Sequence, residues 1–267
     1  MPSVAPPASA AESLLAFWAQ AGVDVCLEDQ PVNRTIRPAR PERPAKPTAV
    51  IQAEPQVSPD VASAMAQARD LAAAAADLPA LERAIAAFDG CALRFQGARR
   101  AVFARGNPEG PLMLIGEAPG AEEDLQGQPF VGRAGQLLDR MLAAANLTDR
   151  AFITNTVFWR PPGNSNPSHA DQMVCSPFLE RAVELLRPRL ILLLGGAAAK
   201  SVLKREEGIL SLRGRWFEWR SGDGNLVIPA LPTLHPAFLL RQPAAKKKAW
   251  QDLLTLTERL DRPERPT

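Results

Sequence analysis

Residues 111–139, PLMLIGEAPGAEEDLQGQPFVGRAGQLLD, combine an apolar run, a glycine-rich loop and the start of a helix. The run from Pro111 to Ile115 predicts a short buried strand, which ends at Gly116. The loop that follows carries further glycines and several acidic residues, and a helix is expected to begin near Ala134. A strand–loop–helix unit of this kind places reactive groups at the carboxyl edge of a parallel sheet, where open α/β folds bind ligands. We therefore expect the rest of the chain to build this sheet and to complete a pocket in front of the loop.

Apolar runs elsewhere in the chain predict further strands of the same sheet. The strands expected after the first one are 152–158, 190–194 and 231–234. The helices expected between and after them are 135–147, 168–186, 196–202 and 244–260. A small strand is expected at 102–103, and a hairpin over 216–229. Because strands alternate with helices, the predicted fold class is α/β, with a parallel sheet between helices on both faces.

Proline is unevenly distributed and suggests where the domain begins and ends. The chain has 267 residues, enough for one α/β domain and an extension, and its 26 prolines crowd into the first sixty residues and the C-terminus. We expect an N-terminal extension over 1–60, in which a short helix at 11–22 precedes a Pro/Arg-rich linker. The linker is interpreted as a solvated tether, and a basic arm that touches DNA phosphates is the alternative. The domain itself is expected over 61–260, followed by a disordered tail over 261–267.

Charge and cysteine content narrow the classes of protein. The net charge is +2, so total charge does not by itself indicate a nucleic-acid binder, although a local basic face is compatible with it. The three cysteines lie far apart and form no disulfide framework. With no signal peptide, this favours a protein of the reducing cytoplasm. No apolar stretch approaches membrane-spanning length, so no membrane partner is expected, and we expect a monomer.

The candidate chemical groups lie in three loops that follow strands. Glu117 is a candidate base or stabiliser of positive charge, unless it caps loop amides, and Glu123 is a second candidate, unless it is a solvated charge. Phe130 is interpreted as a stacking surface for a flat ligand, with a place in the core as the alternative. Asn155 is a candidate to recognise an imide edge, because a side-chain amide donates and accepts hydrogen bonds at once. The alternative is a turn residue at the end of the strand. His235 precedes a proline at a rigid corner, and a satisfied structural histidine is the alternative.

Three other polar features are given structural interpretations. His169 stands at a predicted helix start and is interpreted as structural. The Gly195–Gly196 turn lacks the third glycine and the acidic residue of a dinucleotide site, so it is interpreted as strand-to-helix packing. Lys246 to Lys248 are interpreted as a solvated face, with phosphate binding beside Arg241 as the alternative.

Three segments in this order resemble the family 4 uracil-DNA glycosylases of the uracil-DNA glycosylase superfamily: GEAPGAEEDLQGQPFVGRAG, TNTVFWRPPGN and LPTLHPAFLLR. The resemblance covers about residues 81–255. It implies a three-layer α/β/α sandwich with a central four-stranded parallel sheet. It also implies a monofunctional DNA-repair enzyme that flips uracil out of DNA and hydrolyses its N-glycosidic bond, leaving an abasic site. The alternative is a binding protein that captures uracil-containing or abasic DNA with little turnover.

The resemblance assigns a role to individual residues. Phe130 would stack on uracil, and Asn155 would bind the O4 and N3–H edge, which excludes cytosine. His235 would donate to O2 while negative charge builds on the departing base, helped by backbone amides near Glu117 and Ala118. The implied substrate-binding residues are Gly116, Ala118, Pro119, Gly120, Phe130 and Asn155. The implied DNA-contacting residues are Arg160, Asn164, Leu239, Leu240 and Arg241.

The catalytic carboxylate stays open between two glutamates. In the best-known branch of the superfamily, the aspartate that activates water lies two residues after the strand-end glycine, and an aromatic that excludes thymine lies two further on. Those positions here are Ala118 and Gly120. Glu117 is therefore the candidate for sugar stabilisation or for positioning water. Glu123 is the alternative for the water role, and it is also a candidate to block the thymine methyl group.

The resemblance also implies a 4Fe–4S cluster held by four cysteines, and here the sequence departs from the family. Cys91 and Cys175 are kept, but Phe88 and Trp159 stand at the other two positions. Two thiolates do not complete a Cys₄ site, and both replacements are large and apolar, so they fill the volume as core. Cys26 lies in the extension and is not a replacement ligand. We therefore predict a protein with no metal and no cofactor.

Overall fold

The alanine-rich stretch before the predicted sheet folds into two helices in the computed structural model, which describes residues 59–262. They are α2 (Pro59–Ala74) and α3 (Leu78–Ala87). Asp77 caps α3 by accepting a hydrogen bond from the Ala80 amide at 2.7 Å, and a proline occupies the first turn of the helix. The predicted extension helix, the Pro/Arg-rich linker and residues 263–267 of the predicted tail lie outside the described residues.

The sheet has six strands among the described residues, in the order β1-β3-β2-β4-β6-β5. They are β1 (Ala104–Gly106), β2 (Leu112–Gly116), β3 (Ala151–Asn155), β4 (Leu190–Leu194), β5 (Phe217–Arg220) and β6 (Val227–Thr233). The inner four, β3, β2, β4 and β6, run parallel, and the edge strands β1 and β5 are antiparallel to their neighbours. The predicted fold class is confirmed, and the parallel centre has the expected four strands with one antiparallel strand added at each edge.

Three strand boundaries differ from the prediction. The strand expected over 152–158 is β3, which ends at Asn155. The small first strand begins at Ala104, not at Val102. The second arm of the hairpin and the predicted strand at 231–234 are one continuous strand, β6. Pro229 and Pro232 lie inside β6, and prolines within an apolar run indicate a break, because proline has no amide to donate to the sheet.

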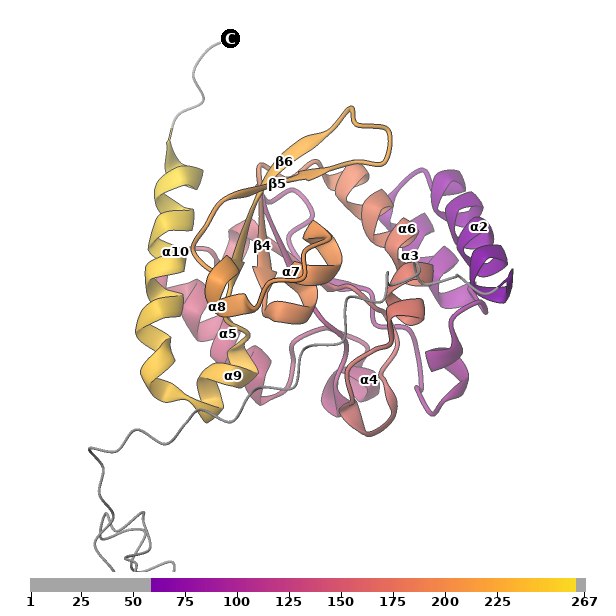
Figure 1. Cartoon of the computed structure of the whole chain (residues 1–267), viewed down its shortest axis with the longest axis horizontal. Helices are drawn as coiled ribbons and strands as arrows, with labels where there is room; N and C mark the ends of the chain where they lie inside the picture. The colour runs from indigo at the N-terminus through magenta and orange to yellow at the C-terminus, as the bar shows by residue number, and fades with distance from the viewer. Residues whose placement is uncertain (1–58, 263–267) are drawn as a thin grey trace, which may run out of the picture. The chain divides into compact units, whose positions relative to one another are not determined.

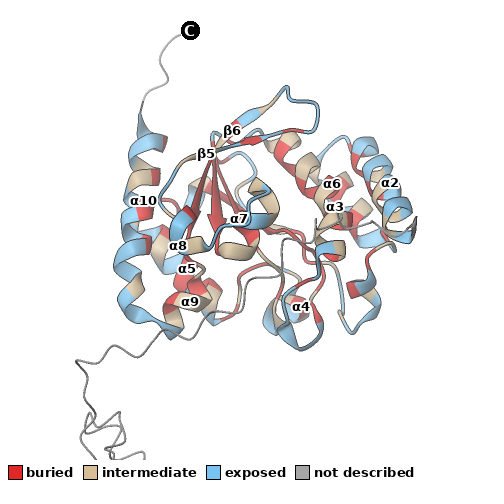
Figure 2. Ribbon diagram, viewed as in Figure 1, coloured by how far each residue is buried: buried red, intermediate tan, exposed pale blue. Residues whose placement is uncertain are grey.

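Helices cover both faces of the sheet, which makes the three expected layers (Figure 1). Met113 and Ile115 of β2 pack with the core that contains α3 and α6, whereas Leu112 and Leu114 pack with the core that contains α5 and α10. The remaining helices are α4 (Ala121–Gln126), α5 (Arg133–Ala144), α6 (His169–Leu186), α7 (Gly196–Leu203), α8 (Ile209–Leu212), α9 (Pro236–Arg241) and α10 (Lys246–Asp261). Figure 2 shows the buried residues along the strands and on the helix faces turned toward them. No helix in the described range is long and apolar enough to cross a membrane.

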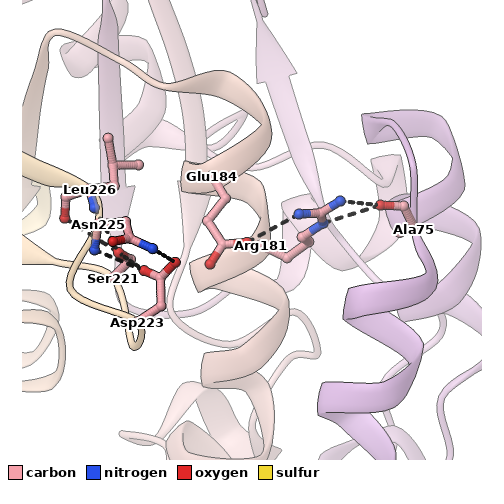
Figure 3. Close-up of polar contacts among 7 residues, drawn as sticks. All are labelled: Ala75, Arg181, Glu184, Ser221, Asp223, Asn225 and Leu226. Carbon is pink, nitrogen blue, oxygen red and sulfur yellow. Dashed lines mark hydrogen bonds and ion pairs between the residues drawn. The ribbon is translucent and has the colours of Figure 1, made fainter.

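Polar contacts tie α2 to the sheet layer through α6. The Arg181 guanidinium donates from Nε and Nη2 to the Ala75 carbonyl oxygen, at 3.1 and 2.9 Å (Figure 3). The same guanidinium pairs with Glu184 at 3.1 Å.

A side chain also caps the turn between β5 and β6. Asp223 accepts a hydrogen bond from the Asn225 amide at 3.0 Å, which closes the hairpin (Figure 3).

The register of the parallel strands brings three loops to one edge. Gly116 at the end of β2 pairs with Asn155 at the end of β3. Leu194 at the end of β4 pairs with Thr233 at the end of β6, which places His235 just beyond the same edge. This is the carboxyl edge of the parallel strands, where the sequence predicts the pocket.

Candidate active site

A cavity of ≈ 400 Å³ lies at this edge, and we call it the base pocket. Its walls include Glu117 and Phe130 from the loop after β2, and His235 and Arg241 from the segment after β6. Asn166, from the loop before α6, completes one side and was not singled out by the sequence. Segments after β2, β3 and β6 therefore do line one cavity, but Asn155 itself is buried and is not among the lining residues.

Gly116 lets two of the predicted base-binding side chains meet. A Cβ atom at this position would lie 2.4 Å from Asn155 Oδ1 and 2.5 Å from Phe130 Cζ, so both side chains press against its bare backbone. Asn155 is buried, and its Oδ1 accepts no hydrogen bond from any residue that the structure describes. A buried amide oxygen without a partner is costly, and a ligand that donates to it removes that cost.

Phe130 is both core and pocket wall, because its side chain is only 6% exposed and yet borders the cavity. Its backbone adopts a positive φ of 56°, which is strained for an aromatic residue. Arg105 holds this conformation by donating to the carbonyl oxygens of Pro129 and Phe130 at 2.7 and 3.1 Å. Gly135 packs so closely that a Cβ there would lie 1.7 Å from the Phe130 carbonyl oxygen. Sequence analysis did not reveal this role of Arg105, because these two acceptors are backbone groups 24 and 25 residues away.

His235 is neutral, and its hydrogen bond defines the tautomer. Burial, followed by the nearby Arg241 charge, lowers the pKa of His235 to about 4, against the opposing pull of Glu123. Nδ1 accepts a hydrogen bond from the Ala237 amide at 3.1 Å, so the single ring proton of the neutral imidazole is on Nε2. The imidazole and Phe130 ring centroids are 5.7 Å apart. The site thus presents a neutral N–H donor beside the aromatic wall.

The turn before α7 also contacts this histidine. Gly195 has a φ of +94°, and a Cβ there would lie 2.9 Å from the His235 Cβ. A glycine is therefore required both by the backbone conformation and by the close approach. This supports the interpretation of the Gly195–Gly196 turn as a packing feature.

The two candidate glutamates have different surroundings. Glu123 accepts hydrogen bonds from the amides of Gly120, Val131 and Gly132 at 3.0, 3.0 and 2.9 Å. The interpretation of Glu123 as a solvated charge is therefore wrong, since its carboxylate joins the two ends of the loop. In contrast, Glu117 Oε1 is buried and accepts no hydrogen bond from any described residue. Burial raises the pKa of the Glu117 carboxyl.

Asp124, one of the acidic residues that follow β2, is buried and not a solvated charge. It lies in α4, a helix that the sequence analysis did not predict, and it is only 1% exposed. Its carboxylate accepts a hydrogen bond from the Arg99 amide at 2.8 Å, which ties the loop to the segment before β1. The negative charge has a structural use at this position.

The predicted DNA-contacting residues divide into accessible and inaccessible ones. Asn164 is exposed and accepts a hydrogen bond from Arg160 Nε at 2.7 Å. Arg241 is exposed and borders the base pocket, and Leu240 is half-buried beside it on α9. Leu239 is fully buried in a core with Leu234 and Ala249, and this contradicts its expected contact with DNA.

The positions that correspond to cluster ligands form an aromatic core. Phe88 and Trp159 are each 1% exposed, and their ring centroids are 6.3 Å apart. Phe178 packs against Phe88 at 5.1 Å. Cys91 and Cys175 are fully buried, and their hydrogen bond lowers the pKa of Cys91, while burial raises the pKa of Cys175. Across residues 59–262, no three His, Cys, Asp or Glu side chains gather where a metal ion would fit. Two thiols among large rings do not fit a cluster that needs four thiolates.

Comparisons with known proteins agree with this geometry. Residues 103–254 match the family described as the uracil DNA glycosylase superfamily, and the chain belongs to it. Among curated proteins, the chain is 35% identical over 173 residues to the type-4 uracil-DNA glycosylase of Sulfurisphaera tokodaii, covering 62% of this chain and 78% of the relative. It is 37% identical over 168 residues to the type-4 uracil-DNA glycosylase of Saccharolobus solfataricus, and the alignment covers 61% of this chain and 77% of the relative. It is 36% identical over 182 residues to the type-4 uracil-DNA glycosylase of Pyrobaculum aerophilum, and the alignment covers 66% of this chain and 91% of the relative. Within the superfamily, the chain belongs to the type-4 branch.

Proposed function

We propose that this protein is a uracil-DNA glycosylase, which hydrolyses the bond between uracil and deoxyribose and leaves an abasic site. One observation carries the proposal: Phe130 meets the buried, unpartnered Oδ1 of Asn155 at Gly116, and the same aromatic ring lines one cavity together with the neutral imidazole of His235. Enzymes that cleave a base from DNA take the target nucleotide out of the stack, and we assign this cavity to the flipped base.

Base recognition is assigned to Asn155 and Phe130. The Asn155 Oδ1 accepts from uracil N3–H, and its Nδ2 donates to O4. Cytosine reverses both groups, with an acceptor at N3 and a donor at N4, so it leaves the buried amide unpaired. Phe130 stacks on the base, and its strained backbone is held by Arg105 before the ligand arrives.

Departure of the base is assigned to His235 and the loop amides. When the glycosidic bond breaks, its electron pair stays on uracil and negative charge develops at O2. Nε2–H of the neutral imidazole donates a hydrogen bond to O2, and the amide near Ala118 adds a second donor. Because the pKa of His235 is about 4, the ring stabilises the anion without needing to give up its proton.

The sugar carries the opposite charge, and this is assigned to Glu117. An anionic carboxylate beside the base pocket stabilises the oxocarbenium character at C1′. Water then adds to C1′ through its oxygen, and one of its protons leaves to Glu117 or to solvent. The unpartnered Oε1 of Glu117 is available for that water, whereas both oxygens of Glu123 are occupied.

We further propose that the enzyme works without an iron–sulfur cluster. The support is the donor set, because Phe88 and Trp159 fill the space with rings that have no metal-binding atom. The two thiols that remain are both buried. The chemistry described above uses only side chains and backbone amides of this chain.

DNA binding beside the base pocket is assigned to exposed groups around it. Arg160 and Asn164 lie in one loop, and Arg241 stands at the pocket rim. Leu240 is the side chain available to brace the stack that the flipped base leaves, since Leu239 is buried. Arginine and asparagine at these positions contact phosphates, so they do not distinguish one base sequence from another.

The test is turnover on a single-uracil oligonucleotide. The full chain is incubated with single- and double-stranded substrates, and alkali then cleaves the strand at each abasic site. We expect multiple turnovers on uracil and none on matched cytosine or thymine strands. Asn155→Ala should lower kcat/KM by roughly 100-fold, and Asn225→Ala, in the exposed hairpin turn, should not. If the protein bound the oligonucleotide tightly but released no uracil, it would be a binding protein and not an enzyme.

A further inference from the structure

A second cavity opens from the wall of the base pocket, and we call it the side channel. It has a volume of ≈ 600 Å³ and shares Glu117 and Asn166 with the base pocket. It runs between the start of α6 and the length of α7, which lie next to each other in Figure 1. A third cavity of ≈ 240 Å³ shares Gln172, Ser201 and Lys204 with it. The third cavity also carries Glu180, which lies within the influence of the Lys204 charge, and an Arg220–Glu218 ion pair at 2.6 Å. A nucleotide in the base pocket therefore has an open path along this side of the molecule.

The side channel is lined by groups that suit phosphates. Lys200 lies on α7, Lys204 is the residue that caps the end of this helix with a φ of 52°, and both are exposed. His169 faces them from α6, and Ser201 and Gln172 add neutral hydrogen-bond donors. The sequence analysis had assigned His169 a structural role. Two ammonium groups beside one cavity attract a chain of negative charges, and we call this pair the lysine track.

Two acidic residues, Glu206 and Glu117, line the side channel itself. Lys200 Nζ is 3.8 Å from Glu206, whose side chain is fully exposed, so the pair is weak and a phosphate can displace it. Glu117 lies at the junction with the base pocket, where the proposed mechanism places the sugar. The charge pattern thus changes from a carboxylate at the sugar position to ammonium groups farther along.

We propose that the side channel binds the phosphodiester backbone on one side of the flipped nucleotide, with Lys200 and Lys204 contacting successive phosphates. The proposal rests on the proposed function, because the flipped nucleotide defines where the strand starts. Lysine offers a compact charge and no base readout, so the contact is independent of sequence. It adds affinity and orients the strand, and it takes no part in bond cleavage.

Equilibrium binding of the full chain tests the proposal. The probes are labelled single strands with 2′-fluoro-deoxyuridine, whose fluorine slows cleavage, in a full-length form and in forms truncated 5′ or 3′ of that nucleotide. We expect Lys200→Ala and Lys204→Ala each to raise Kd about fivefold on the full-length strand. Each should also flatten the slope of log Kd against log salt by about 0.7. On the strand truncated on the side that occupies the channel, the same variants should bind like the wild type.

Two further variants control for general charge effects. Arg83→Ala removes one exposed positive charge from α3, away from the channel, and should leave Kd and the salt slope unchanged. Glu206→Gln removes the competing carboxylate and should lower Kd. The proposal would be contradicted if the lysine variants lost equal affinity on both truncated strands, or if their salt slope matched that of the wild type. Because these are binding measurements, a protein that binds in this pattern but releases no uracil refutes the proposed activity alone.

Discussion

Glu117 and Glu123 both border the base pocket, but only Glu123 has its carboxylate oxygens hydrogen-bonded within the protein. Glu123 accepts three backbone amides, and Glu117 Oε1 accepts none from the described residues. A half-buried carboxylate with a buried, unpartnered oxygen is unfavourable for folding, and groups of this kind are kept where the chemistry needs them. We therefore infer that Glu117 acts on the substrate and that Glu123 shapes the loop.

Glu117→Gln should lose activity while the fold gains stability. The amide has nearly the same size but no charge, so uracil release should fall by roughly 100-fold. Removal of the desolvated charge should raise the free energy of unfolding by about 1 kcal/mol. Single-turnover rates and urea unfolding measure the two effects. A loss of stability in this variant would show that the carboxylate is structural.

The Glu117 carboxyl should determine how the rate of uracil release depends on pH at the acidic end. Burial raises the pKa of Glu117 above the ordinary value of 4.5, so the anion is lost as pH falls through that raised value. Uracil release should therefore rise with pH through a value above 4.5 and then level off. Single-turnover rates of the wild type and Glu117→Gln across pH measure this, and the variant should lack the rise. An unchanged rise in the variant would assign it to another group.

Glu123→Gln should show the opposite balance. An amide has one accepting oxygen, so it leaves at least one of the three loop amides without its partner. We expect a loss of about 2 kcal/mol in unfolding free energy, together with a lower rate from the distorted loop. Glu122→Gln, at the exposed neighbouring position, is the matched control and should be close to neutral. If Glu123→Gln stopped uracil release without any loss of stability, the two roles would be reversed.

Gly116→Ala should disrupt base recognition directly. The added methyl group would lie 2.4 Å from Asn155 Oδ1 and 2.5 Å from Phe130 Cζ, so both side chains must shift. We expect uracil release to fall by more than about tenfold and overpacking to cost about 1–3 kcal/mol. Gly222→Ala is a suitable control, because its methyl group would meet only Glu180 Oε2 at 3.8 Å. Normal kinetics in Gly116→Ala would argue that the base does not sit against this backbone.

How far the sequence predicts this molecule depends on the range of each interaction. Buried strands and the loops after them follow from local apolar runs, so the sheet and its carboxyl edge were predictable. The Arg105 contact with the Phe130 carbonyl and the Asp124 contact with the Arg99 amide join distant segments through backbone groups, which leave no pattern in the sequence. Leu239 and Leu240 are adjacent in one short helix, and only its packing decides which of them is buried.

The aromatic core around the two thiols makes a prediction about metal content. Aerobically purified full chain should contain far less than one iron per chain and no charge-transfer band near ~400 nm. A double variant, Phe88→Cys with Trp159→Cys, restores four cysteines around the same space and should gain iron on reconstitution. Iron in the wild type at the level of a full cluster would contradict the prediction and would require ligands outside the described residues.

His235 should make stability depend on pH below neutrality. Its pKa falls from 6.5 to about 4 on folding, mainly through burial, so the unfolded chain binds a proton that the folded chain refuses between these values. Stability therefore decreases as pH falls from 6.5 toward 4, by up to about 3 kcal/mol from this group. Urea unfolding across this range should show a shallower decrease for His235→Asn than for the wild type. His169→Asn, the same change at the exposed histidine, should keep the wild-type slope. An equally steep decrease in His235→Asn would mean that this imidazole is not held neutral by the fold.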